Sequence, residues 1–114
     1  MDNYLPPIID VFQALADPTR LAIICALVSG AQTVSSLAAP FDMALPSFMK
    51  HVTVLERSGL ILTQKVGRTR TCELRPETLS IAEKWIAEQR AMWEARSDRM
   101  VQFVERLHQE EQKQ

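Results

Sequence analysis

The sequence has few of the residues on which disulfide-linked and metal-binding scaffolds depend. It contains 2 cysteines, Cys25 and Cys72, which lie far apart and outside any C-x-x-C spacing. This excludes a disulfide framework and a cysteine-rich zinc site, and it favours a reducing compartment. No apolar run approaches the roughly 18 residues of a membrane-spanning helix, and the amino terminus lacks the basic and apolar segments of a signal peptide. We therefore expect a soluble, cytoplasmic protein that does not contact membranes.

The usual motifs of enzyme active sites are missing as well. The chain has no glycine-rich phosphate loop, no nucleophile elbow and no cluster of carboxylates. Its 114 residues, 46% of them hydrophobic and 24% charged, have the composition of an ordinary globular domain. We therefore expect one domain over residues 1–114 that is not an enzyme and carries no cofactor.

The net charge of −1 hides an uneven distribution of charge along the chain. Residues 1–44 carry one basic and four acidic side chains, whereas residues 45–75 carry six basic and two acidic ones. Residues 76–114 are slightly acidic, with six basic and eight acidic side chains. The positive charge is concentrated in the middle of the chain, as expected if that part contacts an anionic partner such as nucleic acid.

The first third of the chain predicts three short helices. Residues 8–16 place apolar side chains at helical spacing, and Asp17 and Pro18 then have the pattern of an N-cap followed by a first-turn proline. The second helix covers about residues 18–28, and a short third helix covers residues 33–39. The side chains expected to face inward from the second helix are Leu21, Ile24, Cys25 and Val28.

The segment LPSFMKHVTVLERSGLI, residues 45–61, separates two kinds of side chain on one helix. At roughly 100° per residue, Phe48, Val52 and Leu55 share one face, which indicates a core contact. The opposite face carries polar side chains and a proline that the first turn tolerates. Gly59 is well placed to end the helix. The outward set is Pro46, Ser47, Lys50, Thr53 and Arg57.

From residue 60 onward the period changes to that of strands. Residues 60–66 and 68–74 are two β-leaning runs separated by Gly67, which is typical of a hairpin. Arg68 lies at its tip, with Lys65 and Arg70 nearby. A tight turn between the last two helices followed by a two-stranded hairpin describes a winged helix-turn-helix, mainly α with a small β-hairpin wing.

The last part of the chain, residues 76–110, predicts one long helix, and about 30 residues of helix would be about 45 Å long. Its apolar side chains recur at steps of three and four residues, although Gln89 and Arg96 interrupt the pattern. A domain of this size cannot cover such a helix, so we expect a second subunit to pack against it. The alternative is a helix that folds back over its own domain, with Trp85 and Trp93 in the core. The expected homodimer interface consists of Phe12, Leu79, Ile86, Trp93, Met100, Phe103 and Leu107.

In a winged helix-turn-helix the outward face of the 45–57 helix enters the DNA major groove and the wing contacts the backbone or the minor groove. We therefore expect residues 8–75 to be a DNA-binding core and residues 76–110 a dimerisation helix. Double-stranded DNA is the expected partner. The alternative is a winged helix that serves only as a protein-interaction or dimerisation module. The expected DNA-contacting residues are Leu45, Pro46, Ser47, Met49, Lys50, Thr53, Arg57, Lys65, Arg68 and Arg70.

The motifs ADPTR, LPSFMKH and LERSGL, followed by the Gly-Arg pair of the wing, occur in an order and spacing that resemble the ArsR/SmtB family of bacterial repressors. The resemblance covers about residues 8–107. It implies a dimer that binds a near-palindromic operator, usually upstream of its own gene, and that an effector commonly releases. The family's DNA-contacting positions correspond here to Leu45, Ser47, Met49, Lys50 and Arg68.

This chain departs from the family pattern at two places. Ala44, Leu45 and Met49 replace residues that are often polar in relatives, and apolar groups can touch a thymine methyl but cannot hydrogen-bond a base. The cysteine pair of metal-responsive relatives is absent, and His108 with Glu111 cannot complete a zinc site. We therefore expect no metal site, and the sequence identifies neither the operator nor an effector.

Two isolated polar residues and the thiols have structural interpretations. His51 lies near the buried edge of its helix, which favours a structural hydrogen bond over a base contact. Arg20, next to the predicted N-cap, favours a structural ion pair over a DNA contact. Cys25 and Cys72 are expected to be buried packing residues rather than a redox pair. Met92 with its neighbouring tryptophans could line a small-molecule pocket, but such a stripe is more typical of packing.

Overall fold

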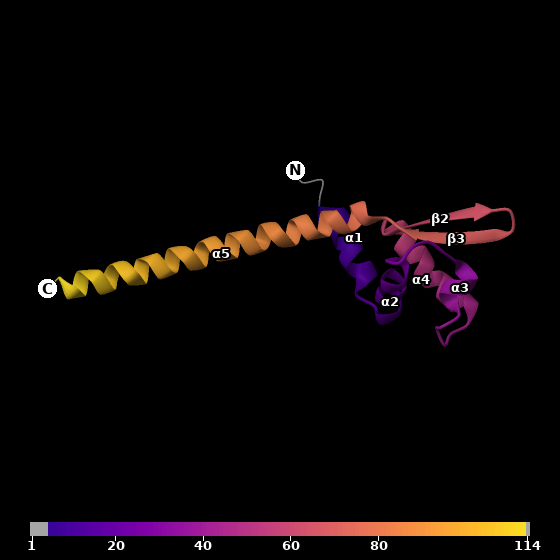
Figure 1. Ribbon diagram of the computed structural model, residues 1–114, viewed down its shortest axis with the longest axis horizontal. Helices are drawn as coiled ribbons and strands as arrows, with labels where there is room; N and C mark the ends of the chain where they lie inside the picture. Colours follow the sequence, from indigo (N-terminus) through magenta and orange to yellow (C-terminus); the bar gives the residue numbers. More distant parts are fainter. Residues whose placement is uncertain (1–4, 114) are drawn as a thin grey trace. The chain divides into compact units, whose positions relative to one another are not determined.

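The computed structural model describes residues 5–113, with side chains from Ile8 onward. The two ends of the predicted domain, residues 1–4 and 114, lie outside the described residues. Contacts divide the chain into two units, residues 1–82 and 83–114. The elements are α1 (Leu5–Leu15), α2 (Pro18–Leu27), β1 (Gln32–Thr33), α3 (Val34–Ala38), α4 (Leu45–Arg57), β2 (Ile61–Val66), β3 (Thr69–Leu74) and α5 (Pro76–Gln112) (Figure 1).

The predicted start of α2 is confirmed in detail. Asp17 has an extended backbone, and its carboxylate accepts a hydrogen bond of 3.0 Å from the backbone N–H of Arg20. Pro18 occupies the first turn, where its missing N–H removes no helical hydrogen bond. The N–H of Arg20 lowers the pKa of the Asp17 carboxyl below its usual value, and this outweighs the opposing effect of desolvation. The positive charges of a protonated His51 and of Arg20 lower the pKa by smaller amounts.

The face of α2 that packs inward differs from the predicted one. Ile23, Ile24 and Leu27 are buried, whereas Leu21, Cys25 and Val28 are exposed. Only Ile24 was predicted correctly. The stretch LAIICALV is apolar on every side, so its hydrophobic period does not determine which face meets the core. Packing against α4 determines which face of α2 is buried, because Ile23 belongs to the same buried cluster as Phe48 and Leu55.

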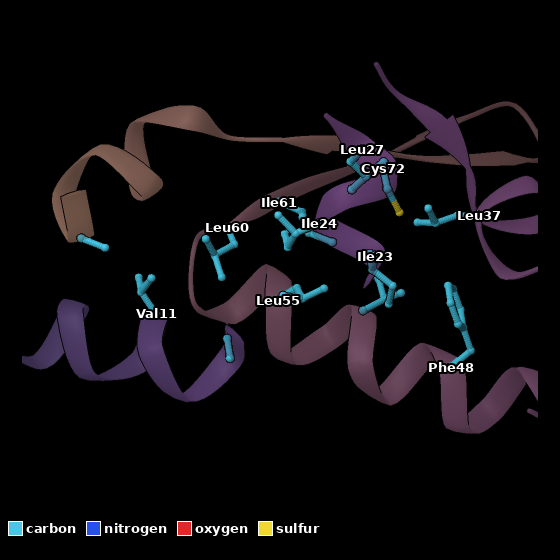
Figure 2. Packing of buried hydrophobic residues seen from close by; sticks show 13 residues of the cluster. Val11, Ile23, Ile24, Leu27, Leu37, Phe48, Leu55, Leu60, Ile61 and Cys72 are labelled. Carbon is cyan, nitrogen blue, oxygen red and sulfur yellow. The ribbon is translucent and has the colours of Figure 1, made fainter. Parts of the chain in front are cut away.

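The inward face of α4 is confirmed. Phe48, Val52 and Leu55 are all buried, and Figure 2 shows Phe48 and Leu55 pointing from α4 toward Ile23 of α2. The ring of Phe48 also lies 5.3 Å from the ring of Phe41, centroid to centroid. The buried stripe fixes the rotation of α4 about its own axis. The polar residues of the helix are therefore held outward.

A Schellman motif ends α4 at the predicted glycine. The N–H of Gly59 donates to the carbonyl of Glu56, and the N–H of Leu60 donates to the carbonyl of Leu55. Gly59 has a φ of 81°, a left-handed conformation that glycine adopts without steric cost. The chain turns here into β2, and Leu60 and Ile61 return to the core.

The hairpin has the predicted position, but it belongs to a sheet of three strands. Strands β2 and β3 are antiparallel, with Val66 opposite Thr69, which leaves Gly67 and Arg68 as a two-residue loop. Gly67 has a φ of 64°, as the first loop residue of a type II′ turn requires. The unpredicted strand β1 pairs with β3 on its other side, giving the order β1-β3-β2. Figure 1 shows the hairpin extending past α3 and α4.

The long carboxy-terminal helix is confirmed as α5, which has 37 residues. Its start is attached to the end of α4, because the hydroxyl of Thr78 donates to the carbonyl of Gly59 at 2.6 Å. After Ala82 no described residue is buried. The predicted interface residues Phe12 and Leu79 pack against the core of the first unit. The other five are exposed, and they are Ile86, Trp93, Met100, Phe103 and Leu107. None of the described helices is both long and apolar enough to cross a membrane.

Candidate nucleic-acid interface

The outward face of α4 forms an open groove with a cationic rim. Pro46, Lys50 and Arg57 are exposed and Thr53 is half-buried, as their helical spacing predicts. Together with Met49 and Val54 they line a surface depression of about 360 Å³. Lys50 and Arg57 have no acidic partner in the described part of the chain, so both charges are available to an anionic ligand.

Two predicted contact residues of α4 are partly engaged within the protein. The hydroxyl of Thr53 donates to the carbonyl of Met49 at 2.9 Å, so it can offer only an acceptor to a base. The Met49 side chain is half-buried and packs against the core cluster. Both residues are more suited to shaping the groove than to forming strong base contacts.

The amino-terminal end of α4 is open to solvent. Leu45 is 55% exposed, and Pro46 and Ser47 are exposed beside it. Ala44 is the N-cap and supplies no side-chain hydrogen bond, so the first N–H groups of the helix lack a capping partner. Such a helix start favours an anion, and a DNA phosphate is one candidate.

The wing carries three cations that are exposed but differ in their partners. Lys65 and Arg70 are directly opposite each other on β2 and β3, where like charges repel. The Arg70 guanidinium lies 3.9 Å from the Glu56 carboxylate and donates to the Thr63 hydroxyl at 3.2 Å. Thr63 in turn donates to Glu56. Arg70 therefore helps attach the wing to α4, whereas Lys65 and the loop residue Arg68 are not neutralised by a described salt bridge.

A second polar cluster connects α4 to the start of α2. Arg20 donates to the carbonyl oxygens of Ala14 and Gln13 at 2.7 Å and 3.1 Å, and its Nη1 lies 3.2 Å from Nδ1 of His51. This confirms the structural hydrogen bond predicted for His51. The guanidinium of Arg20 therefore contacts carbonyl oxygens and an imidazole. The Asp17 carboxylate is contacted by the backbone N–H of Arg20.

The thiols and the acidic residues do not form a metal centre in the described residues, because no three His, Cys, Asp or Glu side chains there could hold an ion. Cys72 is buried as predicted, and burial raises the pKa of its thiol. Cys25 is exposed, contrary to the prediction, because it lies on the outer face of α2.

Sequence reasoning also missed Val54 in the groove, although its position four residues after Lys50 places it on the same face.

Comparison with known proteins decides the family. A helix-turn-helix domain model matches residues 15–64. The arsenical resistance operon repressor of Escherichia coli is 32% identical over 106 residues, which cover 92% of this chain and 87% of that repressor. The crystal structure of an ArsR family transcriptional regulator is 54% identical and covers 82% of this chain and 97% of its own, with a TM-score of 0.78. The chain belongs to the ArsR family.

A more distant structure shows the same fold. The homodimeric winged helix-turn-helix DNA-binding domain of a Mycobacterium bovis protein is 21% identical, with a TM-score of 0.62 over 77% of this chain and 83% of that one. As a member of the ArsR family, the chain is a DNA-binding transcriptional regulator with a winged helix-turn-helix fold. Its relatives are regulators rather than enzymes.

Proposed function

We propose that this ArsR-family regulator is a homodimer that represses transcription by binding a near-palindromic operator, including one upstream of its own gene. The observation that carries the proposal is the unneutralised cationic groove of α4, which is held outward by a buried stripe on the opposite face. In DNA-binding proteins of this architecture, such a helix lies in the major groove and contacts base edges from its first turns.

The contacts divide by chemistry into two groups. Leu45 and Ser47 at the start of α4 are exposed and lie at positions suited to base edges, a methyl contact from the first and a hydrogen bond from the second. Lys50, Arg57, Lys65 and Arg68 are suited to phosphates, which supply affinity without sequence information. Arg70 adds less, because Glu56 already offsets part of its charge.

Residues 83–113 support the dimer. Residues 83–112 form a continuous part of α5 in which Trp93 is 65% exposed and Phe103 is 50% exposed. An isolated helix gains little stability without tertiary packing, and the apolar positions here recur at the spacing of a helix-to-helix contact. A second copy of α5 would cover them. A two-fold dimer would place two α4 helices about one turn of DNA apart, roughly 34–36 Å, and so match a palindromic site.

The proposed function is tested by binding to the chain's own upstream DNA. Fluorescence anisotropy at two salt concentrations would compare that duplex with an unrelated duplex of equal length. We expect tight, salt-sensitive binding that favours the upstream duplex by about 100-fold or more. Equal, weak binding to both duplexes would contradict autorepression and would favour the protein-interaction alternative.

Removing either cation from the α4 groove should weaken DNA binding without changing the dimer. For Lys50→Ala and Arg57→Ala we expect each variant to lose roughly 5- to 20-fold in operator affinity, because each removes one charge-assisted contact. Sedimentation would show an unchanged mass. Lys113→Ala removes an equal charge near the end of α5 and serves as the matched control. Wild-type affinity in both groove variants would exclude this face of α4 as the DNA surface.

Arg68 at the wing tip should affect salt dependence more than sequence preference. If Arg68 contacts a phosphate, Arg68→Ala should reduce the slope of log affinity against log salt by about 0.9. The operator and the unrelated duplex should weaken by similar factors, since phosphates carry no sequence information. Arg99→Ala on α5 is the charge-matched control. An unchanged slope in the Arg68 variant would show that the wing does not reach the DNA backbone.

A further inference from the structure

The hydrogen bond between Arg20 and His51 determines where the proton of the imidazole lies. A guanidinium has only donors, so Nδ1 of His51 must be the acceptor at 3.2 Å. An imidazole that accepts at Nδ1 carries its proton on Nε2. The same guanidinium donates to two carbonyls at the end of α1. Arg20 therefore connects α1 and the start of α2 to the middle of the DNA-binding helix.

A second group competes for the same ring nitrogen. The Oδ2 atom of Asp17 lies 3.7 Å from Nδ1 of His51. Asp17 keeps its negative charge where imidazoles titrate, because the N–H of Arg20 lowers the carboxyl pKa. An unprotonated Nδ1 can accept from Arg20, whereas an Nδ1 that carries a proton, as it does in the imidazolium, can donate to Asp17. The presence or absence of a proton on Nδ1 therefore selects between the two partners.

We propose that His51 is a positioning residue through which proton binding changes how α4 is held against α2. Protonation ends the hydrogen bond to Arg20, places two cations side by side and transfers His51 to Asp17. The orientation of α4 then differs from the one suited to specific base contacts. This inference rests on the proposed DNA-binding role of α4 and adds a regulatory property to it: specificity for the operator decreases as pH falls.

Few other charges surround this contact. Asp10 of α1 and Arg57 of α4 line the same cleft of about 340 Å³ as Arg20. Lys50, the neighbour of His51 in sequence, is exposed on the outer face of α4. No further acid or base is bonded to His51 in the described residues, so its partner is Arg20 or Asp17. The other histidine, His108, is exposed on α5 and contacts Gln112.

The test compares operator binding with binding to an unrelated duplex between about pH 7.5 and pH 5.5, the range in which imidazoles change charge. Any added positive charge raises the affinity for both duplexes, and this common increase cancels in the ratio of the two affinities. For the wild type we expect the ratio to fall by roughly 3- to 10-fold at the lower pH, the effect of losing one charge-assisted hydrogen bond. His51→Asn keeps an acceptor near Nδ1 without a titrating ring, and its ratio should be constant.

The control variant is His108→Asn, which removes the second histidine and should keep the wild-type pH profile. A His51→Asn profile identical to that of the wild type would overturn the proposal. So would a wild-type ratio that does not change with pH.

A measurement without DNA separates this inference from the proposed function. The ¹⁵N chemical shifts of the imidazoles, measured by NMR in the wild-type protein, report the tautomer of His51. We expect an unprotonated Nδ1 at neutral pH and a hydrogen bond from Nδ1–H to a carboxylate after protonation. A proton on Nδ1 at neutral pH would refute the exchange of partners. Equal binding to both duplexes at every pH would refute the proposed function, and the NMR result would still decide the exchange.

Discussion

Phe103→Glu should convert the regulator from a dimer to a monomer and lower its affinity for the operator by at least about 100-fold. The side chain is half-exposed on α5, in the part of the helix where the large apolar residues from Ile86 onward are exposed in the single chain. In a two-fold interface one substitution introduces a carboxylate from each subunit, and both would be removed from water. The operator affinity falls because two half-sites are no longer bound by one particle.

Light scattering at a fixed protein concentration would measure the mass, and anisotropy the affinity. Val28→Glu is a suitable control, since Val28 is 69% exposed at the end of α2 and lies outside the predicted interface. That variant should remain dimeric. A Phe103→Glu protein that keeps the dimer mass would show that the subunits associate through another surface. Monomers that still bind the operator tightly would show that dimerisation is not needed for affinity.

Phe48→Ala should lower the free energy of unfolding by about 3–5 kcal/mol, a large part of the stability of a domain of this size. The ring is fully buried, contacts Phe41 and belongs to the cluster that fixes the rotation of α4. Truncation removes the ring from the core and leaves a cavity between α4 and α2. The loss of DNA binding should follow, because α4 is then no longer held in one orientation.

Urea denaturation followed by circular dichroism would measure the change, at equal protomer concentration because dimer stability depends on it. Leu45→Ala is the matched control on the same helix. Its side chain is largely exposed, so the free energy of unfolding should change by less than about 0.5 kcal/mol. Equal stability losses in the two variants would contradict the assignment of Phe48 to the core.

The features that the sequence predicted well are those that depend on local patterns. Phe48, Val52 and Leu55 are separated by helical steps and alternate with polar residues, so the buried face of α4 follows from period alone. Gly59 and Gly67 mark turns that need positive φ, and both adopt it. The cap formed by Asp17 is likewise a short-range feature, completed within three residues.

The features that it predicted poorly depend on contacts between distant residues. Strand β1 has two residues, too few for a period of two to appear, and it exists because Gln32 and Thr33 pair with β3 some 40 positions later. Cys25 was placed on the wrong side of α2 because that helix is apolar all round. Arg20 and His51 are 31 residues apart, so no spacing rule relates them. The contact between Glu56 and Arg70 of the wing likewise joins residues that no spacing rule relates.

The uncovered apolar residues of α5 also bear on how the regulator responds to its own abundance. If only the dimer binds the operator tightly, the active species grows faster than in proportion to the number of chains, because association depends on protomer concentration. A cell that halves synthesis of the protein would then lose more than half of its active repressor. Expression of the controlled gene would change over a narrower range of copy number than under a repressor that binds as a single chain.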